Sequence, residues 1–237
     1  MTTQDKASRV DEIKTATRVR KLTSTQMRYL TALYVIIRNG GMADDELVAT
    51  SLLSDMMQEP NSNTSRMIER LREQDMIQHV PYQGVRLTLE GEAKAIIQLR
   101  KRRIIHAFLM TVMGFAWHEI HDEACRIEYA TDDIVLQRML VMAGNPSHDP
   151  FGEPIDVYAN AKNDTPLTTV PVGAKYSISR ITVRKSDRLQ YLDVLGLRPS
   201  MPFELLNKAP FDGPLQIKMG REYRILGYDL ARVIWVS

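Results

Sequence analysis

The sequence predicts an α+β protein of several domains, and three observations support this prediction. Helical periodicity dominates the chain from residue 23 to residue 143. A stretch rich in Pro, Gly, Asn and Asp follows at residues 145–171, and short strand-like runs separated by turns fill residues 172–237. A chain of 237 residues is long enough for two or three such domains, each with its own core.

The composition is that of a globular cytoplasmic protein. Hydrophobic residues make up 44% of the chain and charged residues 25%, and no apolar run approaches the roughly 20 residues that span a bilayer. One cysteine excludes an intrachain disulfide framework and fits a reducing compartment. The net charge of +2 does not by itself indicate a polyanionic partner, but Lys and Arg gather locally, for example in RKRR at residues 100–103.

The first domain is predicted at residues 22–88, after a flexible basic arm at residues 1–21. Thr23 and Gln26 have the spacing of a capping box, which predicts the start of a helix. Two further helices are expected at residues 44–57 and 62–74, separated by a short polar break. Two strand-like runs around a Gln-Gly turn, within residues 76–87, predict a hairpin. Together these elements form a winged helix-turn-helix.

The other domains follow from the same patterns. Residues 89–144 are expected to be all-helical, with glycines closing the helices, and residues 145–171 have the composition of a linker. Residues 172–237 read as five short strands and one helix at 187–195, for which a small β-barrel is the simplest arrangement.

The segment HDEACRIEYA, residues 121–130, is the strongest candidate for chemistry. His121, Cys125 and Glu128 lie at i, i+4 and i+7, on one face of a helix. An imidazole, a thiolate and a carboxylate suit a divalent ion such as Mn, Fe, Co, Ni or Zn. The alternative is a packed cysteine whose neighbours satisfy the His and the Glu. No oxyanion loop, phosphate-binding glycine loop or HExxH motif accompanies these residues, so we expect no enzyme and no catalytic residue.

Five segments in order resemble the diphtheria-toxin-repressor family of metal-dependent bacterial transcriptional regulators. They are TQMRYLTALY (25–34), YQGVRLT (82–88) with EG (90–91), HDEACRIE (121–128), DPFGEPI (149–155) and YLDVLGLRP (191–199). The resemblance covers nearly the whole chain after residue 22. It implies a helical domain for dimerisation and metal binding at residues 89–144. It also implies an SH3-like domain at residues 172–237, of the kind found in ferrous-iron-transport accessory proteins.

The resemblance also implies a homodimer that reads a palindromic operator in double-stranded DNA, as a repressor in metal homeostasis. The leading turn of the helix at 62–74 would face the bases and the hairpin would touch the backbone. The DNA-contacting candidates are Ser62, Asn63, Thr64, Ser65, Arg66, Tyr82, Gln83 and Arg86. The plainer alternative is that this turn only caps a helix and that Arg66 is solvated.

The family's metal ligands are only partly present. At the positions of its principal site stand Arg28, Cys125, Glu128 and Tyr129, and at those of its ancillary site stand Arg102, His106, His121, Lys185 and Arg188. Arginine cannot be deprotonated and therefore cannot bind a cation as a ligand.

Two hypotheses follow. In the first, Arg28 replaces the metal by pairing with Glu128, and the protein binds DNA without metal or responds to another ligand or to redox state. In the second, one Mn, Fe, Co or Zn ion per subunit binds at a rearranged site of His106, His121, Cys125 and Glu128, with His118 as a further candidate. A pure interaction protein built on the SH3-like domain is a third possibility.

Overall fold

The structure, a computed structural model, describes residues 22–40, 46–157 and 164–237. The expected N-terminal arm, residues 1–21, lies outside these ranges. The chain divides into two compact units, Met1–Arg100 and Lys101–Ser237. None of the helices in the described ranges has the length and apolarity that a bilayer crossing requires.

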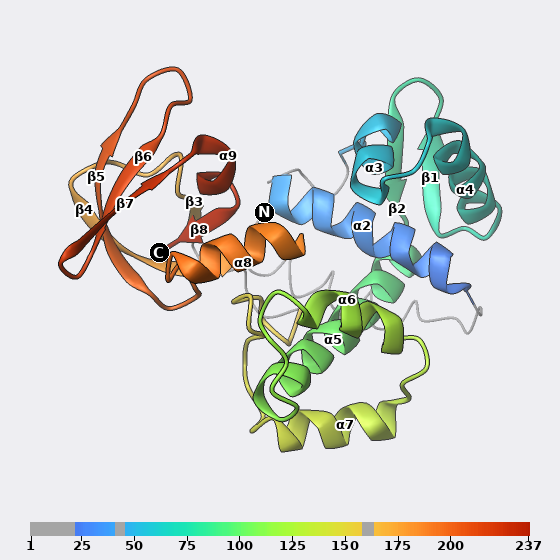
Figure 1. Ribbon diagram of the computed structural model, residues 1–237. Coiled ribbons are helices and arrows are strands. Elements are labelled where there is room, and N and C mark those ends of the chain that lie inside the picture. Colours follow the sequence, from blue (N-terminus) through green and yellow to red (C-terminus); the bar gives the residue numbers. More distant parts are fainter. Residues whose placement is uncertain (1–21, 41–45, 158–163) are drawn as a thin grey trace, which may run out of the picture. The chain divides into compact units, whose positions relative to one another are not determined.

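The first unit contains the helices and the hairpin that the sequence predicts (Figure 1). The order along the chain is α2 (Ser24–Gly40), α3 (Thr50–Met57), α4 (Asn61–Glu73), β1 (Ile77–Val80), β2 (Gly84–Leu87) and the beginning of α5 (Leu89–Thr111). The two strands pair antiparallel, with Ile77 opposite Leu87. This arrangement is a winged helix-turn-helix.

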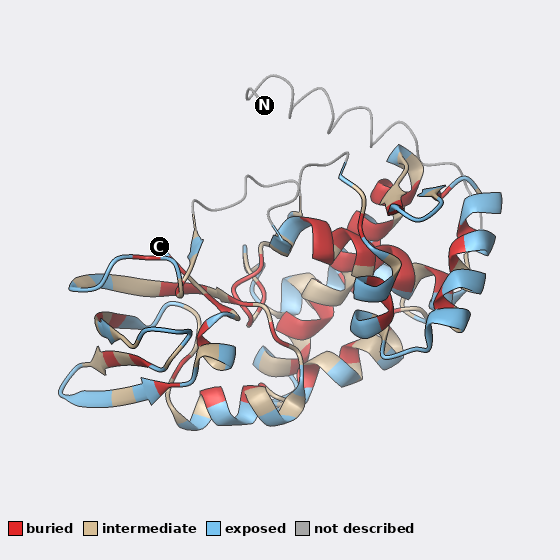
Figure 2. Ribbon diagram, turned by 90° about the horizontal axis from the view of Figure 1, so that it is seen from above, coloured by how far each residue is buried: buried red, intermediate tan, exposed pale blue. Residues whose placement is uncertain are grey.

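The start of α2 is fixed by the capping box. The backbone N–H of Thr23 donates to Gln26 Oε1 at 2.9 Å, and the N–H of Gln26 donates to Thr23 Oγ1 at 3.2 Å. The helix then buries Leu30, Leu33 and Ile37 at helical spacing, each less than 5% exposed. Figure 2 shows the buried residues of the helices as red segments between exposed blue ones.

The helix expected at residues 44–57 is shorter than predicted. Residues 44 and 45 lie outside the described ranges, and α3 begins only at Thr50. Val48 pairs instead with Val85 of the hairpin, with N–H···O distances of 2.8 and 2.9 Å in the two directions. A Cβ at Gly84, whose φ is +139°, would lie 2.3 Å from Val48 O, so this approach requires glycine. The apolar residues before Thr50 therefore serve a short strand pairing rather than a helix.

The second unit begins with helices, as predicted. The last part of α5 is followed by α6 (Ile120–Ile127) and α7 (Asp133–Met142). Asp132 caps α7, because its Oδ1 accepts from the N–H of Val135 at 2.8 Å.

A six-stranded antiparallel sheet forms the rest of this unit. Its strand order is β3-β8-β4-β5-β6-β7. The strands are β3 (Thr165–Pro166), β4 (Ala174–Ile181), β5 (Pro202–Lys208), β6 (Leu215–Met219), β7 (Glu222–Leu226) and β8 (Ile234–Val236). The helices are α8 (Ser186–Val194), expected from the sequence, and α9 (Tyr228–Ala231), which was not expected.

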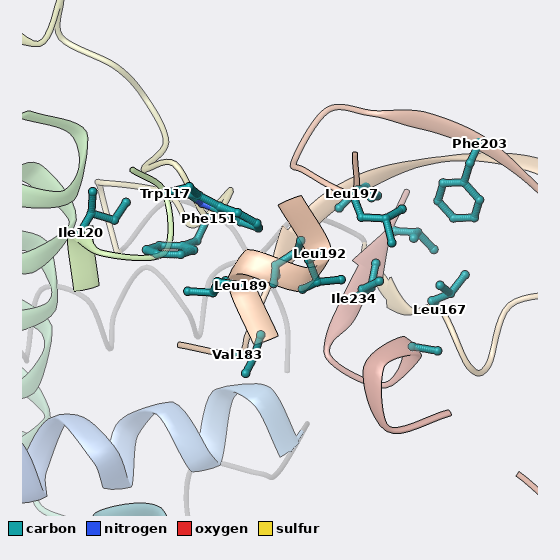
Figure 3. Packing of buried hydrophobic residues seen from close by; sticks show 14 of the residues in the cluster. Trp117, Ile120, Phe151, Leu167, Val183, Leu189, Leu192, Leu197, Phe203 and Ile234 are labelled. Carbon is teal, nitrogen blue, oxygen red and sulfur yellow. The ribbon is translucent and has the colours of Figure 1, made fainter. Parts of the chain in front are cut away.

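One hydrophobic core runs through the whole second unit. Trp117 and Phe151 lie beside Leu189 of α8 in Figure 3, and their ring centroids are 5.6 Å apart. Phe151 belongs to the stretch expected to be a linker, yet it is fully buried. A Cβ at Gly152, whose φ is +84°, would lie 2.1 Å from Ser179 O. The prolines and glycines here therefore make a tight buried turn rather than a loose connection.

Candidate nucleic-acid interface and metal centre

The leading turn of α4 presents polar side chains to solvent. Ser62, Ser65 and Arg66 are exposed, at the end of the helix where backbone N–H groups and the helix dipole favour phosphate. Thr64 differs from the prediction because its side chain is fully buried, and its hydroxyl lies 3.3 Å from the hydroxyl of Tyr29 on α2. Thr64 therefore anchors the helix and is removed from the DNA-contacting set.

Asn63 is held between two charged neighbours. Its amide Nδ2 donates to Glu59 Oε2 at 3.0 Å, and its Oδ1 accepts from Arg66 Nη2. Both ends of the amide are thus engaged, which conflicts with a bidentate contact from Asn63 to adenine. The chain of contacts from Glu59 through Asn63 orients the guanidinium of Arg66 at the surface of the helix.

The hairpin carries the other predicted contacts. Tyr82, with φ +64°, is fully exposed at the turn, and Gln83 beside it is also exposed. Arg86 of β2 donates through Nε to Gln78 Oε1 on the opposing strand at 2.8 Å. These three residues lie on one hairpin, as a wing requires.

In the second unit, α5 and α6 are joined by a buried ion pair. Arg102 donates through Nε to Glu128 Oε2 at 2.7 Å and through Nη2 to Glu128 Oε1 at 2.8 Å. The side chain of Glu128 is fully buried and that of Arg102 is 13% exposed. Burial alone lowers the pKa of Arg102, but the hydrogen bonds and the charge of Glu128 outweigh it and raise the pKa. The guanidinium therefore stays charged, in a two-pronged contact that uses both carboxylate oxygens.

The cation that the structure places on Glu128 is Arg102. Arg28 lies on α2 in the first unit, where it is exposed, and its link to Glu128 stays a prediction. The resemblance placed Arg102 at a ligand position of the ancillary site. In the structure it reaches across to the glutamate of the principal site instead.

His106, His121 and Cys125 form a line of contacts that ends at Asp149. The Nδ1 of His106 lies 2.9 Å from Asp149 Oδ2, the Nδ1 of His121 lies 3.4 Å from His106 Nε2, and Cys125 Sγ lies 3.8 Å from His121 Nε2. A carboxylate can only accept, so His106 donates from Nδ1 and His121 donates from its own Nδ1 to His106. Each imidazole nitrogen in the line thus faces a partner.

Both imidazoles are held neutral. Burial lowers the pKa of His106, although Asp149 opposes the shift, and burial together with His106, Arg184 and Arg102 lowers the pKa of His121. Burial would raise the pKa of Asp149, but the contact with His106 and the nearby arginines bring it below its ordinary value. Asp149 is therefore an ionised carboxylate beside neutral rings.

Asp149 is the site residue that the sequence did not single out. Its Oδ1 accepts from the N–H groups of Phe151 and Glu153 at 2.9 and 3.0 Å, which closes a tight turn. The motif DPFGEP contains the signal for this turn, since Asp before Pro and Gly commonly caps its own backbone. The composition alone, however, did not show that the turn faces His106.

The candidates from the SH3-like part are Lys185 and Arg188, and a role of their side chains at the site stays a prediction. Lys185 is exposed just before α8, and the backbone N–H of Arg188 is bonded to Asp187 Oδ1 at 2.8 Å. The residue that approaches the site is Arg184, whose guanidinium lies 4.1 Å from the ring centroid of Phe151. Glu153 pairs with Arg103 at 3.1 Å, and lies 3.5 Å from Arg180 and 3.8 Å from Arg184.

These surroundings do not fit a metal ion. Within the described ranges there is no group of three or more His, Cys, Asp or Glu side chains arranged to hold one. Glu128 is neutralised by Arg102, and burial and the charge of Glu128 raise the pKa of Tyr129, which keeps the phenol protonated. A dication about 4 Å from a guanidinium is repelled by on the order of 8 kcal/mol at an effective dielectric constant of about 20.

Comparison with known proteins agrees with this architecture. The family model "Iron dependent repressor, metal binding and dimerisation domain" matches residues 88–156, and the FeoA domain matches residues 165–237. The iron-dependent repressor IdeR of Mycobacterium leprae is 28% identical over 200 residues, which are 78% of this chain and 86% of that protein. The diphtheria toxin repressor of Corynebacterium efficiens is 26% identical over 137 residues, 58% of this chain and 57% of that protein.

A solved structure extends the likeness to nearly the full length. A manganese-dependent transcriptional repressor in complex with manganese superposes with a TM-score of 0.79 at 26% identity, covering 89% of this chain and 98% of that one. The likeness spans the winged helix-turn-helix, the helices α5 to α7 and the C-terminal sheet, in the same order along the chain. Over these ranges the chain is similar to iron-dependent repressors, among them the diphtheria toxin repressor.

Proposed function

We propose that the protein is a dimeric, sequence-specific DNA-binding transcriptional regulator. The observation that carries the proposal is the exposed leading turn of α4, where Glu59 and Asn63 hold Arg66 at the helix surface beside a projecting wing. The relatives named above support it, since they are described as repressors and not as enzymes.

The contacts divide into two kinds. The guanidinium of Arg66 suits the two acceptors of a guanine, O6 and N7, in the major groove. Ser62 and Ser65, together with Tyr82, Gln83 and Arg86 on the wing, suit phosphate oxygens, which fix the register but carry no sequence information. The half-site is thus expected to contain a guanine opposite Arg66.

Binding to a palindromic operator requires a second copy of the chain. The matched family model is described as a dimerisation domain, and α7 within it exposes Ile134, Val135, Val141 and Met142. Apolar side chains exposed on one helix favour a protein interface. Two winged units related by a two-fold axis would read the halves of a palindromic operator about one helical turn apart.

The test is selection of binding sequences from random duplex DNA, together with the mass of the free protein in solution. The wild-type chain should be a dimer and enrich a palindrome with a guanine in each half. Arg66→Ala should lose the preference at that base. Arg72→Ala is the matched control, because Arg72 is an exposed arginine of the same helix, paired with Glu69 in its last turn. Enrichment of no sequence by the wild-type dimer would refute the proposal.

A second candidate function is activation by a transition metal. It is favoured by two neutral imidazoles and a thiol in one line, where His121 lies 3.4 Å from His106 and 3.8 Å from Cys125. The solved relative contains manganese, and another solved relative, ScaR, has bound zinc. On this hypothesis one Mn, Fe, Co or Zn ion would bind per subunit, and a chelator would weaken operator binding.

A further inference from the structure

We propose that the guanidinium of Arg102 permanently occupies the role of a regulatory metal in this chain, so that operator binding needs no metal ion. This inference rests on the proposed DNA-binding function for its consequence, but its structural part can be tested without DNA. It assigns the role to Arg102 of α5, on the same helix as His106.

The first argument is geometric. A metal bound between two helices joins them through ligands from each, and the pair of Arg102 and Glu128 does the same for α5 and α6. The two donor–acceptor distances, 2.7 and 2.8 Å, are those of a two-pronged charge-assisted contact. This contact fixes the orientation of one helix relative to the other, as a single-point contact would not.

The second argument concerns charge. Glu128 is fully buried, and a buried carboxylate needs a cation beside it. Arg102 supplies that cation within the chain. Adding a divalent ion would leave the buried cluster with an excess of positive charge, because Arg102 already neutralises Glu128 and Arg184 offsets the charge of Asp149.

The third argument is that the remaining donors are occupied. Asp149 takes the Nδ1 hydrogen of His106 and two backbone N–H groups, so its oxygens are directed at the protein itself. His106 Nε2 faces His121. A metal would have to break several of these contacts before it gained ligands.

The experiment compares four purified full-length proteins: wild type, Arg102→Met, Arg102→His and Arg126→Met. Arg126 is the matched control, since it lies on α6 and its side chain is 69% exposed in a pair with Glu123. Binding of Mn²⁺, Co²⁺ and Zn²⁺ is measured by calorimetry after chelator treatment. Affinity for the selected operator is measured with and without chelator.

The wild type and Arg126→Met should bind no metal stoichiometrically at micromolar concentration, and their operator affinity should change less than about two-fold with chelator. Arg102→Met should bind the operator at least ten-fold more weakly. Arg102→His removes the cation and adds a ligand near Glu128, so it should bind Co²⁺ or Mn²⁺ and should recover operator affinity only when the metal is present.

One tight metal ion per wild-type chain, with operator affinity lost in chelator, would overturn the inference. If Arg102→Met does not fold, Arg102→His and Glu128→Gln remove the same ion pair and take its place. The metal binding of the wild type and its operator affinity in chelator do not depend on any of these variants. A wild type that binds neither metal nor any operator would refute the DNA-binding function. The absence of metal binding would still support the role of Arg102.

Discussion

Arg66 and Arg102 are both held by side-chain oxygens, but their surroundings differ. Arg66 is exposed on α4 and shares an oxygen of a neutral amide, whereas Arg102 is mostly buried and takes both oxygens of an ionised carboxylate. The guanidinium of Arg66 keeps hydrogens for a ligand outside the protein. That of Arg102 is committed to the fold. On the proposals made above, the environment of each arginine decides whether its guanidinium contacts a partner or holds the fold together.

Removing the buried cation should have the largest effect on the protein. Arg102→Met leaves Glu128 buried without a partner, which should lower the free energy of unfolding by about 3–5 kcal/mol, as measured by urea denaturation. Combining Arg102→Met with Glu128→Leu should restore most of that stability, because no buried charge then remains. A single variant as stable as the wild type would show that the pair is not a structural link.

Acid should affect the buried region more than the exposed one. The folded state holds His106 and His121 below their ordinary pKa of 6.5, so below pH 6.5 the unfolded chain binds protons that the folded chain excludes. The free energy of unfolding should therefore be highest above pH 6.5. It should fall as the pH drops, by up to about 2 kcal/mol per histidine at pH 5.

His121→Asn should make the fall shallower when unfolding is followed from pH 8 to pH 5. The groups facing these rings are Arg102, Arg184, Asp149 and the thiol of Cys125. Arginine stays charged in this range, and Asp149, whose pKa is lowered, stays ionised. An unchanged slope in His121→Asn would contradict the assignment of the acid effect to this imidazole.

The exposed arginine should affect DNA and not stability. Arg66→Ala should weaken binding to the selected operator by roughly ten- to a hundred-fold, corresponding to about 1–3 kcal/mol for a base contact. Its unfolding midpoint should match that of the wild type. Replacing the guanine by 7-deazaguanine should weaken the wild type and leave Arg66→Ala unaffected, and equal losses in both proteins would argue against a contact to N7.

The smallest effect is expected at Glu59, which holds Asn63 and through it Arg66. Glu59→Gln keeps an oxygen for Asn63 but removes the charge, so operator affinity should fall only about two- to five-fold. Discrimination at the guanine should fall by the same factor, because Arg66 is then less firmly oriented. A loss as large as that of Arg66→Ala would mean that Glu59 itself contacts the DNA.

Most of the fold was accessible from sequence because local signals and packing agree. The capping box at Thr23 and Gln26, the hairpin before residue 88 and five of the six C-terminal strands were predicted from periodic or turn signals that act over a few residues. The helix predicted from residue 44 failed before Thr50, since pairing of Val48 with Val85 depends on a segment far along the chain.

Less of the site could be predicted from the sequence, for the same reason. The sequence gathered His121, Cys125 and Glu128 on one helix, but the partners of these residues come from other elements. Arg102 lies 26 residues before Glu128, and Asp149 lies 43 residues after His106. Local signals predict the helix that carries Arg102 and the turn that carries Asp149, but they do not show that these two residues meet Glu128 and His106.

Operator affinity of one wild-type sample, measured first in chelator and then with excess Mn²⁺, tests the role of Arg102 most directly. If the Arg102–Glu128 pair stands in for the metal, the two affinities agree within about two-fold and the metal content of the active sample is far below one ion per chain. A ten-fold or greater gain on adding Mn²⁺, with one ion retained per chain, would contradict it.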